Sequence, residues 1–432
     1  MNKQDKIDDF IDTLIEDFGI LPKFAYNNAE FENKVLYSGP YFDKEELSAI
    51  IHTLIFGKWF SSGENVHAFE NAFSKKFNLN SSVMVNSGSS ANLIMMATLK
   101  KYFNWDDQSE IIVSVVGFPT TLSAIITNNL VPIFVDIEMD SLNFDINKIE
   151  EKITDKTKAI FISPVLGNPP NMDALLQLKD KYNIELILDN CDSLGSRWND
   201  KYLNEYSIAS SCSFYPAHHI TTGEGGMVSS NNTEIIKIAR SMVSWGRDCY
   251  CIGSANLLSN GTCKHRFSNW LAPLYNGIVD HKYVFTNIGY NVKPLDIQGS
   301  MGLVQLNKFD KIYKLRRKHK EIIGDIFLDN ISVIKSTTVY DNSSVSWFGI
   351  PFICDSGEIK DRLVKHLEGN GIQTRNYFAG NILIHPAYKK YGNWENYPIA
   401  NQVLEKVFFV GCSPHYTDQT FQYIKKIIKE FV

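Results

Sequence analysis

The chain has 432 residues, of which 44% are hydrophobic and 21% are charged, and its formal net charge is −5 at pH 7. This length exceeds what one ordinary core supports and predicts two domains, while the net negative charge argues against general attraction to nucleic acid or to a membrane surface. No apolar run approaches the ~20 residues that span a bilayer, and the acidic N-terminus is unlike a signal peptide, so we expect a cytoplasmic protein.

Short apolar runs alternate with helical patterns along the first two thirds of the chain. Strands are predicted at 82–86, 111–116, 132–136, 159–164 and 184–189, with helices between them at 90–103 and 172–182. This alternation predicts an α/β domain built on a mostly parallel sheet. The remainder predicts a smaller C-terminal α+β domain, with helices at 308–328, 359–370 and 419–431 and a strand within 343–354. We therefore expect a large domain at 41–305 and a small domain at 306–432, with residues 1–40 packing on the small domain or on a partner subunit.

Two loops carry residues that suit a phosphorylated cofactor. VNSGSSANLIMMA (85–97) has a Gly-Ser-Ser turn directly before an apolar helix, and the backbone N–H groups at a helix N-terminus suit a phosphate. An ordinary capped helix is the alternative. In IELILDNCDSLGS (184–196) a strand ends at Asp189, at the sheet edge where α/β proteins gather functional groups. A carboxylate there could hold a ring nitrogen of an electron-sink cofactor protonated, and an ordinary Asp turn is again the alternative.

A third segment, SCSFYPAHHITTGEGGMVSS (211–230), has two adjacent histidines before a Gly-rich turn. It resembles the cofactor segment of the DegT/DnrJ/EryC1/StrS sugar aminotransferases, which reads roughly SF-x-x-x-K-N-L-T-T-G-E-G-G. Counting back five residues from Gly223 places His218 where those relatives carry the lysine that bonds covalently to pyridoxal phosphate, and no lysine occurs between residues 208 and 230. The resemblance implies a PLP-dependent type I aminotransferase fold and a homodimer with active sites at the subunit interface.

The rest of the family pattern follows in order and implies contacts with the cofactor phosphate, with the face of its ring, with its pyridine nitrogen and with its ring hydroxyl. In chain order the corresponding residues are Gly88, Ser89, Phe118, Asp189, Asp192, Ser213 and Asn291. Asn291 would reach the cofactor phosphate of the neighbouring subunit. At the position of Lys293 the family usually has arginine, so no role is assigned to Lys293. We also expect substrate contacts at His219 and at Arg375. The guanidinium of Arg375 suits a diphosphate, and an ordinary surface charge is an equal alternative.

The replacement of lysine by His218 changes the expected reaction. Imidazole cannot form the covalent link, yet it carries protons well near neutral pH, so the amine form, pyridoxamine 5′-phosphate (PMP), is the expected cofactor. The histidine resembles the 3-dehydratase branch of the family, which acts on nucleotide-linked 4-keto-6-deoxy sugars. Removal of a proton from the 4′ carbon of the cofactor by His218 would then accompany loss of the 3-hydroxyl of the sugar.

The seven cysteines stand in a chain without an export signal, which indicates free, metal-bound or catalytic thiols rather than a disulfide framework. Four of them resemble in spacing the [2Fe–2S] ligands of the CDP-4-keto-6-deoxyglucose 3-dehydrase subgroup: Cys191, Cys249, Cys251 and Cys263. The last gap has eleven residues here and seven in that subgroup, a difference that costs little loop-closure entropy. Structural zinc and scattered buried thiols are the alternatives. The other three are expected core residues: Cys212, Cys354 and Cys412.

This subgroup implies a CDP-linked substrate and a separate NAD(P)H-dependent flavin/iron–sulfur reductase that delivers two electrons. The product would be a 3,6-dideoxysugar for lipopolysaccharide O-antigen. Two other functions stay open. One is a cluster-independent enzyme of the GDP-4-keto-6-deoxymannose 3-dehydratase type, which draws its amine from glutamate. The other is a catalytically degenerate scaffold that only binds the cofactor.

Overall fold

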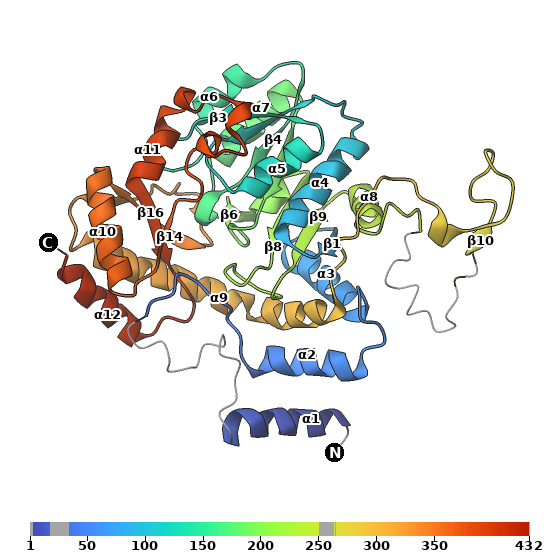
Figure 1. Cartoon of the computed structure of the whole chain (residues 1–432), viewed down its shortest axis with the longest axis horizontal. Coiled ribbons are helices and arrows are strands. Elements are labelled where there is room, and N and C mark those ends of the chain that lie inside the picture. The colour runs from blue at the N-terminus through green and yellow to red at the C-terminus, as the bar shows by residue number, and fades with distance from the viewer. Residues whose placement is uncertain (1–2, 18–33, 250–262, 264, 432) are drawn as a thin grey trace.

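A seven-stranded sheet forms the centre of the protein, in a computed structural model that describes residues 3–17, 34–249, 263 and 265–431. The strand order is β1-β9-β8-β5-β4-β2-β3, with helices on both faces (Figure 1). All neighbours pair in parallel except β9, which is antiparallel to both β1 and β8. The strands are β1 (Ser81–Val85), β2 (Glu110–Ser114), β3 (Val131–Val135), β4 (Thr157–Ile162), β5 (Glu185–Asp189), β8 (Ala209–Ser213) and β9 (Gly226–Ser230). The predicted mostly parallel α/β domain is thus confirmed.

Both faces of this sheet are buried under helices. Phe161 and Ile187 pack in one core cluster with residues of α4, α5 and α8, whereas Ile160 and Leu186 pack on the other face with α7. Burial on both sides explains why the central strands are continuous apolar runs in the sequence. The helices are α4 (Gly88–Tyr102), α5 (Pro119–Thr127), α7 (Met172–Tyr182) and α8 (Thr233–Val243).

The five predicted strands are found within two residues of their expected ends. Helix α7 agrees at both ends, because Asn171 accepts a hydrogen bond from the Ala174 N–H and Asn183 ends the helix with a φ of 52°. Of β8 and β9, the sequence indicated only β9, as a strand that opens after the Gly-rich turn at 223–226. Their sequences, ASSCS and GMVSS, are rich in small and polar residues, and pairing in the sheet rather than β-propensity makes them strands.

A second, four-stranded antiparallel sheet lies in the C-terminal part, in the order β12-β14-β16-β15. Its strands are β12 (Ile334–Ser336), β14 (Gly349–Cys354), β15 (Thr374–Asn376) and β16 (Val407–Gly411). The helices around it are α10 (Gly357–Gly369), α11 (Pro398–Lys406) and α12 (Asp418–Lys429). Helices α10 and α12 confirm the helices predicted at 359–370 and 419–431. Cys354 and Cys412 are buried here, as expected of core thiols.

Helix α9 (Asp296–Leu328) runs from the large sheet to the small one beneath both (Figure 1). It starts twelve residues before the predicted helix, so the expected division at residue 305 falls inside one continuous helix. Gly299 and Gly302 weaken the helical pattern of this segment. A Cβ at Gly299 would lie 2.3 Å from the Val66 nitrogen, and one at Gly302 2.6 Å from the Phe69 ring. Close packing on α3 (Glu64–Lys76) therefore requires both glycines.

The N-terminal residues contact both parts of the chain. Helix α1 (Lys3–Asp12) packs on α2 (Lys44–Phe56), where Asp8 accepts a 2.6 Å hydrogen bond from the Ser48 hydroxyl. Val35 forms a parallel bridge with Ile372 and joins the core of the small sheet. The β10–β11 hairpin projects from the body of the molecule (Figure 1). In the part of the chain that the structure describes, no helix is long and apolar enough to cross a membrane.

The remaining elements are short. The strands are β6 (Arg197–Trp198), β7 (Lys201–Tyr202), β10 (Phe267–Ser268), β11 (Val279–Asp280) and β13 (Ser343–Ser344), of which β6, β7 and β13 form a small sheet. The short helical segments are Thr13–Asp17, α6 (Ile146–Ile149), Glu150–Lys152, Val165–Gly167, Leu203–Tyr206, His281–Tyr283, Ile382–Ile384, Lys389–Tyr391 and Trp394–Asn396.

Candidate active site

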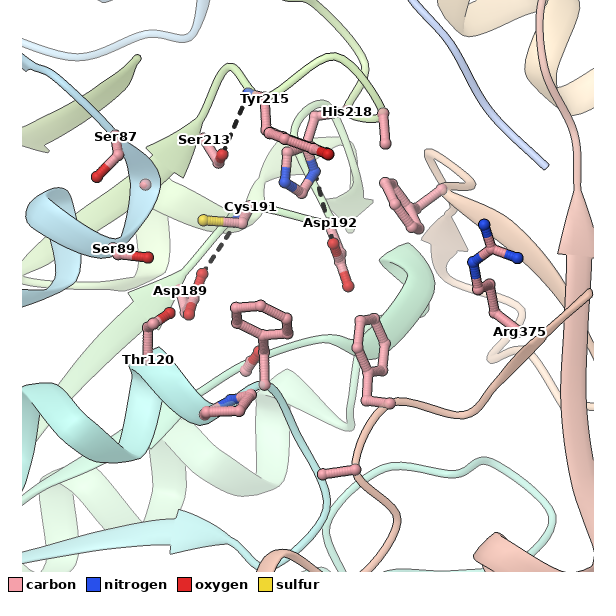
Figure 2. Close-up of a pocket in the computed structure, with 18 of the residues that line it drawn as sticks. Ser87, Ser89, Thr120, Asp189, Cys191, Asp192, Ser213, Tyr215, His218 and Arg375 are labelled. Carbon is pink, nitrogen blue, oxygen red and sulfur yellow. Dashed lines mark hydrogen bonds and ion pairs between the residues drawn. The ribbon is translucent and has the colours of Figure 1, made fainter. Parts of the chain in front are cut away.

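A cavity of about 800 Å³ opens at the carboxyl ends of β1, β5 and β8. This is the edge at which α/β sheets bind ligands. Figure 2 shows the turn at residues 87–89 and Arg375 on opposite sides of the cavity, with His218 and Asp192 between them. Nine of the predicted site residues line it: Gly88, Ser89, Phe118, Asp189, Cys191, Asp192, Ser213, His218 and Arg375.

The turn before α4 forms a cradle suited to an anion. Ser87 caps the helix by accepting a 3.1 Å hydrogen bond from the Ser90 N–H. Gly88 is the first helical residue, and a Cβ at this position would lie 2.4 Å from the Cβ of Ser213. Glycine therefore lets the helix end approach the Ser213 hydroxyl, which also lines the cavity. The first N–H groups of a helix lack partners within the helix and attract phosphate.

Asp189 is buried at the end of β5 and held by three hydrogen-bond donors. Its Oδ2 accepts from the Asn92 amide and from the Thr121 hydroxyl, both at 2.7 Å, and its Oδ1 accepts from the Cys191 N–H at 3.2 Å. The Asn92 carbonyl oxygen in turn accepts a 2.5 Å bond from the Ser211 hydroxyl. This network fixes the orientation of the carboxylate.

Sequence analysis did not single out Asn92 or Thr121. Asn92 could have been found from the sequence, because it is a polar residue near the start of an apolar helix, SANLIMMA. A buried amide at such a position needs a hydrogen-bond partner in the core. Thr121 has no such signal, because threonine is common near the start of a helix. Only the packing of α5 beside β5 reveals its contact with Asp189.

His218 and Asp192 face each other within the cavity wall. The His218 Nδ1 lies 3.6 Å from Oδ1 of Asp192, and the two side chains are 15% and 14% exposed. Burial, with the Arg316 charge as a smaller cause, lowers the pKa of His218 to about 3. Burial and then the charge of Asp189 raise the pKa of Asp192 to about 7. The imidazole is therefore neutral at pH 7, and its Nδ1 has no hydrogen-bond partner among the described residues.

Aromatic side chains frame the cavity around this pair. The ring of Phe348 lies 5.1 Å from the His218 ring, and Phe118, at the start of α5, is 53% exposed and 6.2 Å from the Phe378 ring. Phe118 therefore lines the cavity with much of its ring uncovered, and its stacking on a cofactor ring stays a prediction. Arg375, on β15, lies 4.1 Å above the ring of Tyr37, which also lines the cavity.

His219 and Asn291, which were expected to contact substrate and cofactor, do not line this cavity. We expected His219 to contact substrate, but its side chain is 2% exposed and Nε2 lies 3.1 Å from the Ser346 carbonyl oxygen. Adjacent residues of an irregular loop point in different directions, so only one histidine reaches the cavity, and we correct the expectation for His219 to a role in packing. Asn291 is exposed away from the cavity, where its Oδ1 accepts from the Lys293 ammonium. The contact expected of Asn291 is with the cofactor phosphate of a second subunit, and it stays a prediction.

The four cysteines predicted to bind a cluster have different surroundings. Cys191 lines the cavity, where burial and the Asp189 charge raise the pKa of its thiol well above the usual value. Cys249 is buried, Cys263 is half-buried, and Cys251 lies outside the described residues. No group of three His, Cys, Asp or Glu side chains suited to a metal occurs among the described residues. The residues seen here therefore do not by themselves form the predicted cluster site. Cys212 is a buried core thiol, as expected.

The cavity does fit pyridoxal or pyridoxamine phosphate. An anion cradle at Gly88 and Ser213, an oriented carboxylate at Asp189 and an exposed aromatic ring at Phe118 all face one space. A planar, cationic ring that carries a phosphate needs these three contacts. No lysine lines this cavity in the described part of the chain.

The chain is similar to known proteins over most of its length. The model of the DegT/DnrJ/EryC1/StrS aminotransferase family matches residues 40–429. The chain is 34% identical over 403 residues to dTDP-4-dehydro-2,6-dideoxy-D-glucose 3-dehydratase of Saccharopolyspora spinosa. The aligned region covers 91% of this chain and 86% of that protein. The chain is also 33% identical over 407 residues to the lipopolysaccharide biosynthesis protein RfbH of Salmonella typhimurium, and the aligned region covers 91% of each.

A solved structure extends the similarity to three dimensions. GDP-4-keto-6-deoxy-D-mannose-3-dehydratase of E. coli, with bound hydrated PLP, superposes with a TM-score of 0.79 at 31% identity, over 92% of this chain and 99% of that one. The expected type I aminotransferase fold is thus confirmed. With a family match over nearly its whole length and relatives above 30% identity, this chain belongs to the DegT/DnrJ/EryC1/StrS aminotransferase family.

Proposed function

We propose that this chain is a PMP-dependent sugar-nucleotide 3-dehydratase, which removes the 3-hydroxyl group of a nucleotide-linked 4-keto-6-deoxyhexose. The observation that carries the proposal is a neutral imidazole, His218, in a cavity that fits the cofactor and has no lysine among its described lining residues. Two relatives named as 3-dehydratases support the same reaction class.

The side chains of this site hold and orient the cofactor. Gly88, Ser89 and Ser213 would bind its phosphate, and Asp189 would pair with its pyridine nitrogen. Phe118 would cover one face of the ring. When bound, the cofactor supplies an amine that condenses with the sugar ketone and a ring that accepts electrons.

His218 would move the proton on which the dehydration depends. Its imidazole is neutral, so it can take a proton from the 4′ carbon of the cofactor and later give it to the departing hydroxyl. Asp192 lies 3.6 Å from Nδ1 and can stabilise the positive charge that His218 gains. Phe348 and Phe378 line the cavity and exclude water around this transfer.

The opposite end of the cavity would take the nucleotide. Arg375 is 4.1 Å above the Tyr37 ring and donates from Nη1 to the Thr374 carbonyl at 2.7 Å. A guanidinium fork carries further N–H groups that suit a diphosphate. The sequence resemblance favours CDP, whereas the names of the relatives include dTDP and GDP. Asn291 would reach the phosphate site of a second subunit, which makes a homodimer part of the proposal.

Turnover with a panel of CDP-, dTDP- and GDP-linked 4-keto-6-deoxyhexoses tests this function. With PMP bound, we expect hydrogen to replace the 3-hydroxyl of the sugar, detected by mass spectrometry as the loss of one oxygen, and no adduct between a lysine and the cofactor after borohydride reduction. A lysine adduct would contradict the role of His218. Cofactor binding without turnover of any sugar would instead favour a degenerate scaffold.

A finer proposal concerns the fate of the dehydrated sugar. The spacing of Cys191, Cys249, Cys251 and Cys263 supports a [2Fe–2S] cluster, and Cys191 lines the cavity. Electrons would come from a separate NAD(P)H-dependent flavin/iron–sulfur reductase, and the product would enter dideoxysugar and O-antigen biosynthesis. The described residues do not form a complete cluster site, so the support for the cluster is the spacing of the four cysteines in the sequence.

Iron analysis after anaerobic purification tests the cluster. We expect about two irons per chain and visible absorbance above 400 nm, both lost in Cys249→Ser and both kept in Cys354→Ser, a core thiol far along the chain. Iron-free protein that still dehydrates the sugar would contradict the cluster. It would favour the cluster-independent alternative, which the similarity to GDP-4-keto-6-deoxy-D-mannose-3-dehydratase supports.

A further inference from the structure

Arg316 is a buried cation behind the cavity wall. It lies in the middle of α9 and is 1% exposed. Its Nη2 donates to the carbonyl oxygens of Ala217 and His218, at 3.2 and 3.3 Å, and its Nη1 donates to that of Phe348 at 3.0 Å. The Trp347 carbonyl and the Cys412 sulfur are more distant partners, and these contacts include no carboxylate.

A buried arginine with these contacts lowers the free energy of unfolding relative to a hydrophobic side chain. Its charge is removed from water without an ion pair among these partners, and its Nε is buried with no hydrogen-bond partner in the described chain. An unsatisfied buried donor typically costs ~1–3 kcal/mol. A hydrophobic side chain of similar volume would avoid this cost, so the bonds that Arg316 makes require another explanation.

The segment at residues 346–348 is a firm anchor for these bonds. The Ser346 N–H donates to the Ser196 hydroxyl at 2.9 Å, and the Phe348 N–H donates to the Leu166 carbonyl at 3.0 Å. A Cβ at Gly167 would lie 2.1 Å from the Ser346 carbonyl oxygen, so the backbones are closely packed. The anchor is therefore tied to the loops that follow β4 and β5.

The histidine loop is held by few bonds besides those of Arg316: the Ser38 hydroxyl donates to the Ala217 carbonyl at 2.6 Å, and the His219 Nε2 lies 3.1 Å from the Ser346 carbonyl oxygen. Its residues 215–220 lie between β8 and β9 in turns rather than in a ladder, and the His218 N–H bonds only within the loop, to Tyr215. The anchor also carries Phe348, whose ring packs 5.1 Å from the imidazole. One guanidinium thus joins the backbone of His218 to the backbone of the aromatic residue beside its ring.

We infer that Arg316 is a positioning residue for His218: its guanidinium fastens the histidine loop to the 346–348 segment and so fixes the imidazole in the cavity. The inference deepens the proposed function and rests on it for the role of His218. Arginine suits the task because its planar fork can bond several carbonyls at once, whereas the lysine ammonium is a single point.

Substitution of Arg316 tests the inference through the motion of the loop and through kinetics. In Arg316→Met, we expect amide hydrogen exchange of peptides covering 215–220 to rise by at least tenfold, with little change in the α7 and α10 peptides. We expect kcat to fall by about 100-fold, the size of effect that a 1 Å misplacement produces, with KM and PMP affinity changed by less than about threefold. Arg316→Lys should give a smaller change in both.

Arg317→Met is the matched control. Arg317 is the next residue of α9, and its exposed guanidinium contacts the half-buried Tyr313 and Ser344 hydroxyls, away from the histidine loop. Loop exchange and kcat of this control should equal those of the wild type.

Unchanged loop exchange or unchanged kcat in Arg316→Met would overturn the inference. Failure of both Arg316 variants to fold, or a uniform rise of exchange over the chain, would also overturn it and assign Arg316 to fold stability. If the wild type turns over no sugar nucleotide, the proposed function fails, and the exchange measurement still decides whether Arg316 holds the loop.

Discussion

Replacement of His218 by asparagine is expected to lower kcat by about 10³-fold, within the 10²- to 10⁴-fold range of general acid–base catalysis. Asparagine is polar and fits the space, but it cannot take up a proton. The PMP affinity should stay close to that of the wild type, because the phosphate cradle and Asp189 are untouched. The second readout is the exchange of the 4′ hydrogens of bound PMP with deuterated water, which NMR should show to be lost.

The control for this variant is His67→Asn. His67 is an exposed histidine of α3 whose nearest acidic partner is Glu70, and it is not part of the cavity lining. This substitution should leave both kcat and the hydrogen exchange unchanged. If His218→Asn instead retains more than about a tenth of the wild-type kcat, far above the range expected for a missing proton carrier, another group is the base.

Replacement of Asp189 by asparagine is the second large effect. The side chain keeps its shape but loses the charge that would hold the pyridine nitrogen protonated. We expect kcat/KM to fall by about 10²- to 10³-fold, as on removal of one preorganised electrostatic group. The amide also presents N–H groups to Asn92 and Thr121, both of which donate to the wild-type carboxylate. Because the charge beside the pyridine nitrogen is lost and the hydrogen bonds around residue 189 change, the absorbance band of the bound cofactor should also shift.

Asp136→Asn separates this effect from simple loss of a buried carboxylate. Asp136 follows β3, is 3% exposed, and accepts hydrogen bonds from the N–H groups of Ile399 and Ala400 at the start of α11. Its substitution should lower the free energy of unfolding by about 0.5–2 kcal/mol, as for loss of a helix cap, and leave the cofactor spectrum unchanged. Equal spectra for Asp189→Asn and the wild type would contradict the role of Asp189.

The amino-acid sequence determined the central sheet and much of the site. The parallel strands are apolar runs because both of their faces are buried, so periodicity and turn residues located five of them within two residues. Gly88 follows such a strand and Asp189 ends another, and carboxyl ends of parallel strands meet at one edge. Their convergence on one cavity could therefore be expected from the order of elements alone.

Only the tertiary structure decided the features that depend on long-range contacts. The Ser-rich strands β8 and β9 exist because their neighbours pair with them, and the first turns of α9 tolerate two glycines because α3 packs against them. Which of two adjacent histidines enters the cavity depends on loop geometry, since His219 turns to Ser346. The contacts of Thr121 with Asp189 and of Arg316 with the His218 loop join residues 68 and 98 positions apart. Local sequence patterns report burial and propensity, and they carry no information about partners at such separations.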